Sequence, residues 1–150
     1  MPRSSSLRAG RFSQNGQVYL LTAVTLDRAR PFHDWRTGRL LVDELRAVHL
    51  EGLVTSKAWV LMPDHLHWLV ELNGLTLEQL MRRVKSRSAY TVNQHLGRSG
   101  RLWQKNFHDR AIRREQDLKS VARYIIANPL RAGLAENMGE YPYAWCRWDL

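Results

Sequence analysis

The chain has 150 residues, of which 44% are hydrophobic and 25% are charged, as expected for one globular domain with a substantial core. No apolar run approaches the roughly 18 residues of a membrane helix, so no membrane partner is expected. Lys and Arg number 23 against 14 Asp and Glu, a net charge of +9, and this excess favours a polyanionic partner such as nucleic acid.

The positive charge is concentrated in residues 82–131, which hold 13 Lys or Arg and 3 Asp or Glu. The rest of the chain is close to neutral, so this segment is expected to form most of a nucleic-acid-binding surface. A merely solvated basic surface is the plainer alternative. Cys146 is the single cysteine and cannot form an internal disulfide, so a reducing cytoplasm is the expected compartment.

The first part of the chain is predicted to contain an arm, a strand and a helix. Residues 1–16 are rich in Arg, Ser and Gly and are expected to form a flexible basic arm, followed by a single domain over 17–150. The apolar, β-branched run VYLLTAVTL (18–26) predicts a buried strand. A helix is then predicted from the capping residue Asp34 to about Leu50.

A hairpin and two further helices follow. Strands are predicted over 55–63 and 65–72, joined by a tight Pro-Asp turn. Thr76 begins a long helix through a Thr-x-x-Gln capping box, and a basic loop over 98–107 leads to a short strand. A last helix covers about 115–127 and ends before a proline.

The predicted order is β-α-β-β-α-(β)-α, which indicates an α+β fold. We expect a mostly antiparallel sheet with the helices packed on one side, compatible with a ferredoxin-like arrangement. The aromatic tail YPYAWCRW (141–148) is expected to pack back on the body of the domain.

His65 and His67 flank Leu66 on the second strand of the predicted hairpin. Residues i and i+2 of a strand point to the same face, so the two imidazoles project side by side next to the turn. Such a pair can bind one cation. It can also be two half-exposed histidines on a sheet face, and a His-x-His spacing by itself does not separate the two interpretations.

The last predicted helix carries two polar residues beside its buried stripe. Tyr124 and Asn128 are i and i+4, so they share a face on the flank of that stripe. They can present a hydroxyl and an amide to a cleft; alternatively, Tyr124 covers the edge of the stripe and Asn128 ends the helix. The stripe itself follows i, i+3, i+4, i+7, i+8 spacing and comprises Leu118, Val121, Ala122, Ile125 and Ile126.

Together, these features fit a metal-assisted reaction on a phosphodiester. Two imidazoles and one amide oxygen provide three ligands that suit Mn²⁺ and accept Mg²⁺. No set of cysteines or third nearby histidine is present to close a structural zinc site. A bound metal would polarise the phosphodiester, and a tyrosine hydroxyl would attack the phosphorus and form a covalent phosphotyrosine.

The sequence resembles the single-tyrosine HUH transposases, and among them the REP-associated tyrosine transposases of bacteria. The resemblance covers nearly the whole chain and is strongest in three segments: WVLMPDHLHWLVEL (59–72), RLWQKNF (101–107) and ARYIIANPLRAGLA (122–135). It implies an RRM-like HUH nuclease fold. One departure is Asn106, since family members often carry arginine there, which puts one DNA contact in doubt.

The resemblance also implies a role for each candidate. His65 and His67 correspond to the two metal-binding histidines, Tyr124 to the nucleophile and Asn128 to the third ligand. Tyr90 with Gln94 has the same i, i+4 spacing on the long basic helix, so the resemblance alone decides in favour of Tyr124.

If the resemblance holds, Tyr124 cleaves single-stranded DNA near the foot of a hairpin, and the 3′-OH of another strand reverses the step. Whether the protein is a monomer or a homodimer is left open. Trp103 and Phe107 are candidates to stack on bases, with core packing as the alternative. The candidates for contacts to the DNA backbone are Arg82, Arg83, Lys85, Arg87, Arg110, Arg113 and Arg114.

Two other functions remain open from the sequence. One is a nucleic-acid-binding protein of the same fold without catalysis. The other is a metal-dependent nuclease that uses water, with Tyr124 as a structural residue. Charge does not separate the first from the transposase interpretation, and a covalent protein–DNA adduct separates the second from it.

Overall fold

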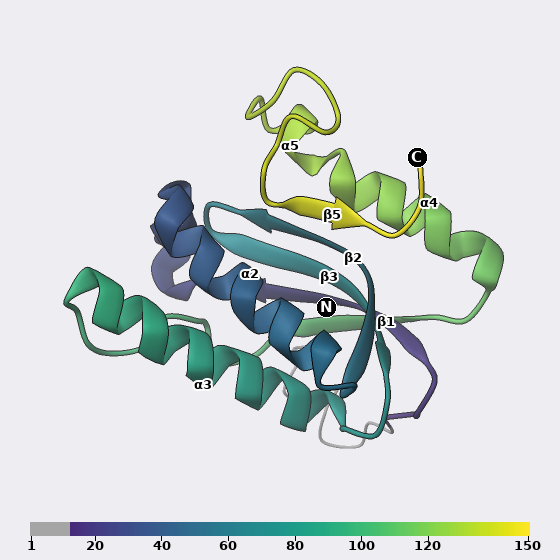
Figure 1. The fold of residues 1–150 in the computed structure, drawn as a ribbon, viewed down its shortest axis with the longest axis horizontal. Coiled ribbons are helices and arrows are strands. Elements are labelled where there is room, and N and C mark those ends of the chain that lie inside the picture. Colours follow the sequence, from purple (N-terminus) through teal and green to yellow (C-terminus); the bar gives the residue numbers. More distant parts are fainter. Residues whose placement is uncertain (1–12) are drawn as a thin grey trace.

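The structure is a computed structural model, and it describes residues 13–150. Its centre is a five-stranded antiparallel sheet with the strand order β4-β1-β3-β2-β5 (Figure 1). The expected α+β fold with a mostly antiparallel sheet is therefore confirmed. The strands are Val18–Val24 (β1), Val54–Met62 (β2), His65–Leu72 (β3), His108–Ile112 (β4) and Ala144–Cys146 (β5).

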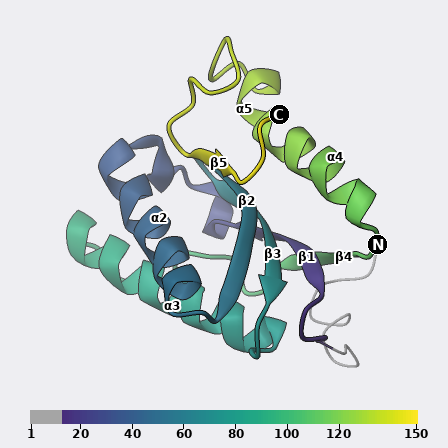
Figure 2. The same cartoon turned by 45° about the vertical axis from the view of Figure 1, so that its right-hand side comes forward.

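The helices lie on both faces of the sheet (Figure 2). They are Trp35–Leu50 (α2), Leu77–Leu96 (α3), Glu115–Ile126 (α4) and Asn128–Arg131 (α5), with two short 3-10 turns at Leu26–Arg28 and Pro31–His33. The side chains of α2 and α3 pack in one core cluster, and those of α4 pack in a second cluster. The expectation that all helices cover one side was thus wrong.

The physical reason is that the central strands are apolar on both faces. On β3, Leu66 and Trp68 pack toward α2 and α3, whereas Leu69 packs against α4. A strand that is apolar on both sides needs cover on both sides to remove its side chains from water. Helix α4 supplies the second cover through Ala122 and Ile125, which are 0% and 1% exposed.

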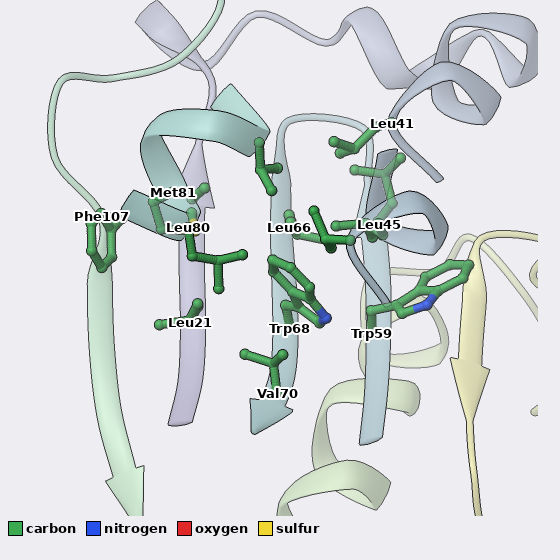
Figure 3. Close-up of a cluster of buried hydrophobic side chains, with 14 of the residues drawn as sticks. Leu21, Leu41, Leu45, Trp59, Leu66, Trp68, Val70, Leu80, Met81 and Phe107 are labelled. Atoms are coloured by element: carbon green, nitrogen blue, oxygen red, sulfur yellow. The ribbon is translucent and has the colours of Figure 1, made fainter. Parts of the chain in front are cut away.

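The larger core lies beneath α2 and α3 (Figure 3). Leu66, Trp68 and Val70 of β3 point into it together with Leu41 and Leu45 of α2. The indole Nε1 of Trp68 donates a hydrogen bond of 2.9 Å to Ser56 Oγ, so the polar group of this buried ring is satisfied. This core holds β3 in place, and β3 carries the two histidines.

The helix boundaries follow the local chemistry read from the sequence. Asp34 caps α2 by accepting from the Arg36 amide at 2.8 Å, and Thr76 and Gln79 form the reciprocal capping box of α3. Gly97 ends α3 with a φ of 64°, a conformation that glycine adopts without a steric penalty. Helix α4 ends at Ile126, and after it the chain makes one more helical turn, α5, in place of the expected stop.

The aromatic tail packs back on the domain, as expected, and adds the edge strand β5. Tyr141 Oη donates to the carbonyl of Leu61 at 2.7 Å, and the Leu61 amide donates to the carbonyl of Tyr143 at 2.8 Å. The sequence did not indicate this fifth strand, because its three residues are too few to show a strand pattern.

The chain before β1 is attached to the domain from residue 13 onward. The Leu77 amide donates to Ser13 Oγ at 3.0 Å, and the Gly16 amide donates to the carbonyl of Leu72 at 2.8 Å. The remainder of the arm expected over residues 1–16 lies outside the described residues. Within residues 13–150, no helix combines the length and the apolar character needed to cross a lipid bilayer.

Candidate active site

His65 and His67 project from β3 on the face of the sheet that α4 covers. Their neighbour Leu66 points to the opposite core, and Leu69, two residues after His67, belongs to the α4 cluster. The two imidazole centroids are 4.8 Å apart, and the rings are nearly perpendicular at 81°. Alternation along the strand thus brings the pair together as expected.

Each of the two rings has a hydrogen-bond partner at Nδ1. Asp64 Oδ1 lies 2.7 Å from His65 Nδ1, and Thr22 Oγ1 lies 2.9 Å from His67 Nδ1. A carboxylate only accepts, so His65 donates through Nδ1–H and its Nε2 carries the lone pair. Metal-binding histidines are commonly oriented through the second ring nitrogen in this way.

The environment favours the neutral form of the His67 ring and the charged form of the Asp64 carboxylate. Burial, followed by the charges of His65 and Arg131, lowers the pKa of His67 to about 4. Partial burial raises the pKa of Asp64, but the hydrogen bonds and charges of His65 and Arg28 outweigh burial and leave that pKa below its usual range. Neutral imidazole is the form that binds a metal, so His67 is ready to ligate at neutral pH.

Tyr124, Asn128 and Arg131 lie along one face where α4 passes into α5. The Tyr124 side chain is 64% exposed, so the hydrophobic core does not require it. The Arg131 guanidinium stacks over the Tyr124 ring at 4.1 Å from its centroid and donates to Asn128 Oδ1 at 3.3 Å. The charge of Arg131 also contributes, after burial and His65, to the lowered pKa of His67.

Tyr90, the rival nucleophile, lies in the other layer of the molecule. It is on α3, which covers the opposite face of the sheet from His65 and His67. Its hydroxyl accepts a hydrogen bond from Gln94 Nε2 at 3.0 Å. The sheet therefore separates Tyr90 from the histidine pair.

The residues present fit a divalent cation. Within residues 13–150, no group of three or more His, Cys, Asp or Glu side chains is placed to hold a metal. A third protein ligand beside His65 and His67 would thus have to come from another side chain type, and the amide oxygen of Asn128 is of the right chemistry. Two imidazoles and an amide oxygen form a mixed N/O set that suits Mn²⁺ or Mg²⁺.

The basic residues divide between two clefts. A cleft of about 410 Å³ lies between β4 and α4 and is lined by Arg110, Arg113 and Arg114, on the face of the sheet that carries the histidines. A cleft of about 470 Å³ lies between α3 and the 98–107 segment, and Arg82 and Lys85 are among its lining residues. The first cleft therefore brings together three of the expected DNA contacts on the face of the sheet that carries the histidines.

Four of the expected DNA contacts make contacts within the protein. Trp103 is 3% exposed and donates from Nε1 to Ser88 Oγ at 2.9 Å, so it belongs to the core and does not offer a stacking face. Phe107 is likewise buried. Arg83 lies 3.3 Å from Glu44 and 2.5 Å from Glu51, and Lys85 Nζ donates to two backbone carbonyls of the 98–107 segment, at 2.9 Å each.

A family model described as transposase IS200 like matches residues 15–128, which is more than half of the chain. The chain belongs to the IS200-like transposase family. The matched region includes both histidines, Tyr124 and Asn128. Membership implies DNA cleavage and strand transfer, which is the activity of transposases.

Two bacterial relatives match at 25% identity. One is a protein of Haemophilus influenzae named as a REP-associated tyrosine transposase, over 86% of this chain and 79% of that protein. The other is the REP-associated tyrosine transposase of Escherichia coli K12, over 62% of this chain and 54% of that protein. The expected resemblance to this group is therefore confirmed.

Solved structures share the fold. A REP-associated tyrosine transposase bound to a REP hairpin superposes with a TM-score of 0.71 at 22% identity, over 89% of this chain and 79% of that one. A transposase from Deinococcus radiodurans gives a TM-score of 0.57 at 23% identity, over 77% of this chain and 93% of that one.

Sequence reasoning missed three residues that shape the site. Asp64 precedes His65 directly, and its position in the hairpin turn was a usable signal. Thr22 is found only from the strand register, which pairs it with His67. Arg131 follows Tyr124 by seven positions and Asn128 by three, a helical spacing that was available in the sequence.

Proposed function

We propose that this protein cleaves and rejoins single-stranded DNA through a 5′-phosphotyrosine intermediate on Tyr124. The observation that supports the proposal is that the histidine pair of β3 lies on the face of the sheet that α4 covers, and that this helix carries the exposed Tyr124 with Asn128 directly after its end. The pair and α4 share one face of the sheet, and Arg131 links the end of the helix electrostatically to His67.

In the proposed reaction, the Tyr124 hydroxyl attacks the phosphorus of a phosphodiester. The bond between Tyr124 Oη and phosphorus forms as the bond between phosphorus and the 3′-oxygen breaks, and a free 3′-OH leaves. Attack by the 3′-OH of another strand reverses the step. The bond energy is retained in the phosphotyrosine, so no nucleotide cofactor is required.

A divalent cation, Mg²⁺ or Mn²⁺, is proposed to be held by His65, His67 and Asn128. When bound, it would polarise the phosphate and stabilise charge on the leaving oxygen. The protein contributes the orientation of the ligands: Asp64 and Thr22 hold the two imidazoles at Nδ1, which leaves both Nε2 atoms to ligate.

The proposed substrate is single-stranded DNA that folds into REP-type palindromic hairpins. A solved structure of the same fold is bound to a REP hairpin, and both relatives are named for association with REP sequences. Phosphate contacts are proposed for Arg110, Arg113 and Arg114 in the cleft beside α4, with Arg82 and Arg87 as further backbone contacts on α3.

The proposal is tested by incubating the protein with a labelled hairpin DNA that carries unpaired flanks, in the presence of Mn²⁺, and analysing the products on denaturing gels. A protein–DNA adduct with a released 3′-OH fragment is expected. His65→Ala and His67→Ala should lose the adduct and retain most DNA affinity, because the basic surface remains. Cleavage without an adduct would indicate a water-using nuclease and contradict the proposal.

A further inference from the structure

The Arg131 side chain is held in a fixed position by the residues proposed for catalysis. Its Nη2 donates to the backbone carbonyl of Tyr124 at 2.8 Å and to Asn128 Oδ1 at 3.3 Å. Its guanidinium lies over the Tyr124 ring, 4.1 Å from the centroid. Two hydrogen bonds and a cation–π contact restrict a long and otherwise mobile side chain.

These contacts leave most of the donors of the guanidinium available. A guanidinium has five N–H groups, and the two contacts through Nη2 account for two of them. Among residues 13–150, Nε and Nη1 have no protein partner, and the residue is exposed. The remaining donors suit an acceptor brought in from solution, and planar donors of this kind match phosphate oxygens well.

The location of the Arg131 guanidinium indicates that this acceptor is the phosphate on which Tyr124 would act. Arg131 lies against the ring that would carry the phosphoryl group, in the turn α5 that follows α4, and α4 covers the face of the sheet that carries His67. A phosphate between Tyr124 Oη and the histidine pair would lie next to this guanidinium. Its negative charge would offset the repulsion between Arg131 and a cation held by the histidines.

We propose that Arg131 contacts a non-bridging oxygen of the phosphate that Tyr124 attacks. This inference rests on the proposed function and adds a catalytic residue to it. Arg131 holds that oxygen while the bond from Tyr124 Oη to phosphorus forms and the bond from phosphorus to the 3′-oxygen breaks. The contact persists in the phosphotyrosine and is present again when a 3′-OH attacks.

A purely structural role is the competing explanation. The bond to the Tyr124 carbonyl is also what a cation at the C-terminal end of a helix makes when it binds the last free carbonyls. In that case, loss of Arg131 would loosen α5 or misorient Asn128, and the resulting loss of activity would not depend on which phosphate oxygens the substrate carries. The test must therefore address the phosphate itself.

Arg131→Gln removes the charge and shortens the side chain, and Arg123→Gln is its matched control. Arg123 is exposed, lies on α4 directly before Tyr124, and loses the same charge when substituted. Arg131→Gln should slow adduct formation on hairpin DNA by about 10²-fold, the usual effect of removing one donor to a developing anion. Arg123→Gln should stay within about threefold of the unmodified protein, and Arg131→Lys should fall between the two.

The decisive substrates carry a methylphosphonate at the scissile position, in which one non-bridging oxygen is replaced by a methyl group. The two diastereomers remove different oxygens. With the unmodified protein, the diastereomer that lacks the oxygen facing Arg131 should react about 10²-fold more slowly than the other diastereomer. Arg131→Gln should cause little further loss of rate with that slower diastereomer. With the other diastereomer, the loss caused by Arg131→Gln should remain in full.

The outcomes distinguish failure of the Arg131 inference from failure of the proposed function. If Arg131→Gln multiplies the loss equally with both diastereomers, or lowers Mn²⁺ affinity enough to explain its defect, Arg131 acts through the structure and the inference is wrong. If Tyr124→Phe abolishes the adduct while Arg131→Gln matches Arg123→Gln, only the inference fails. An adduct that survives in Tyr124→Phe overturns both. Should Arg131→Gln not fold, Arg131→Lys provides the same diastereomer comparison.

Discussion

Thr22 Oγ1 lies 2.9 Å from His67 Nδ1, because the two residues are directly opposite each other in the β1–β3 ladder. This contact restricts the orientation of the His67 ring and leaves Nε2 to bind a metal. Thr22→Val keeps the shape of the side chain and removes the hydroxyl. Loss of such an orienting contact typically lowers metal affinity by about 10- to 100-fold, and calorimetric titration with Mn²⁺ should show a decrease of that order.

The matched control is Thr91→Val. Thr91 is an exposed residue of α3, and its hydroxyl donates only to the carbonyls of Arg87 and Ser88 on the same helix. This variant should bind Mn²⁺ as the unmodified protein does. Equal affinities for the Thr22 and Thr91 variants would show that the hydroxyl does not orient His67.

The metal-free protein should lose stability at acidic pH through His67. The pKa of His67 is lowered from 6.5 to about 4 by burial, then by the charges of His65 and Arg131. Between these values the unfolded chain binds a proton that the folded protein does not, so stability rises with pH in this window. The contribution of His67 to the free energy of unfolding is complete above pH 6.5, where it is roughly 3 kcal/mol larger than at a pH below about 4.

Urea unfolding of the metal-free protein at several pH values between 4 and 7 measures this effect. His67→Gln removes the titrating group, so the free energy of unfolding of this variant should rise less between pH 4 and 7, by roughly 3 kcal/mol. A variant with the same pH dependence as the unmodified protein would show that His67 is not the buried neutral imidazole described here.

Arg82 and Arg83 are neighbours in sequence with opposite roles in the structure. Arg83 contacts Glu44 and Glu51, and Arg83→Gln leaves the largely buried Glu44 carboxylate unpaired, which should lower the free energy of unfolding by about 1–3 kcal/mol, with little change in DNA affinity. Arg82 is exposed and lines the cleft beside α3. Arg82→Gln should leave the free energy of unfolding unchanged. It should reduce the slope of log binding constant against log salt concentration by about 1, as expected for the loss of one phosphate contact.

Both variants are compared by urea unfolding and by hairpin binding at several salt concentrations. If Arg83→Gln weakens DNA binding more than Arg82→Gln without loss of stability, the assignment of the two arginines is reversed.

Much of the fold follows from local patterns in the sequence. The capping box of Thr76 begins α3 as expected, and the alternation around Leu66 places the two histidines on one face. These features depend on residues within a few positions of one another. Local backbone chemistry is therefore sufficient to specify them.

Features that depend on residues distant in sequence could not be predicted. The position of α4 opposite α2 depends on the second apolar face of β3, and the burial of Trp103 depends on its contact with Ser88. The partner of His67 became visible only when the register of β1 against β3 was known. For the same reason, charge alone did not separate Arg83 from arginines that remain exposed.

The proposed nucleophile is the central claim. Tyr124→Phe removes only a hydroxyl from an exposed side chain, so it should preserve the fold and hairpin affinity. Tyr90→Phe is the matched control, because Tyr90 is equally exposed at 64% but lies on the opposite face of the sheet. A phenol has an ordinary pKa of about 10, so its reaction at neutral pH requires the phosphate to be activated by the rest of the site.

The most direct measurement is covalent adduct formation by the two variants on hairpin DNA with Mn²⁺, followed by peptide mapping of the adduct. Tyr124→Phe should form no adduct and show no cleavage, and Tyr90→Phe should form an adduct that maps to Tyr124. An adduct mapped to Tyr90, or cleavage that survives in Tyr124→Phe, would contradict the assignment of Tyr124 as the nucleophile.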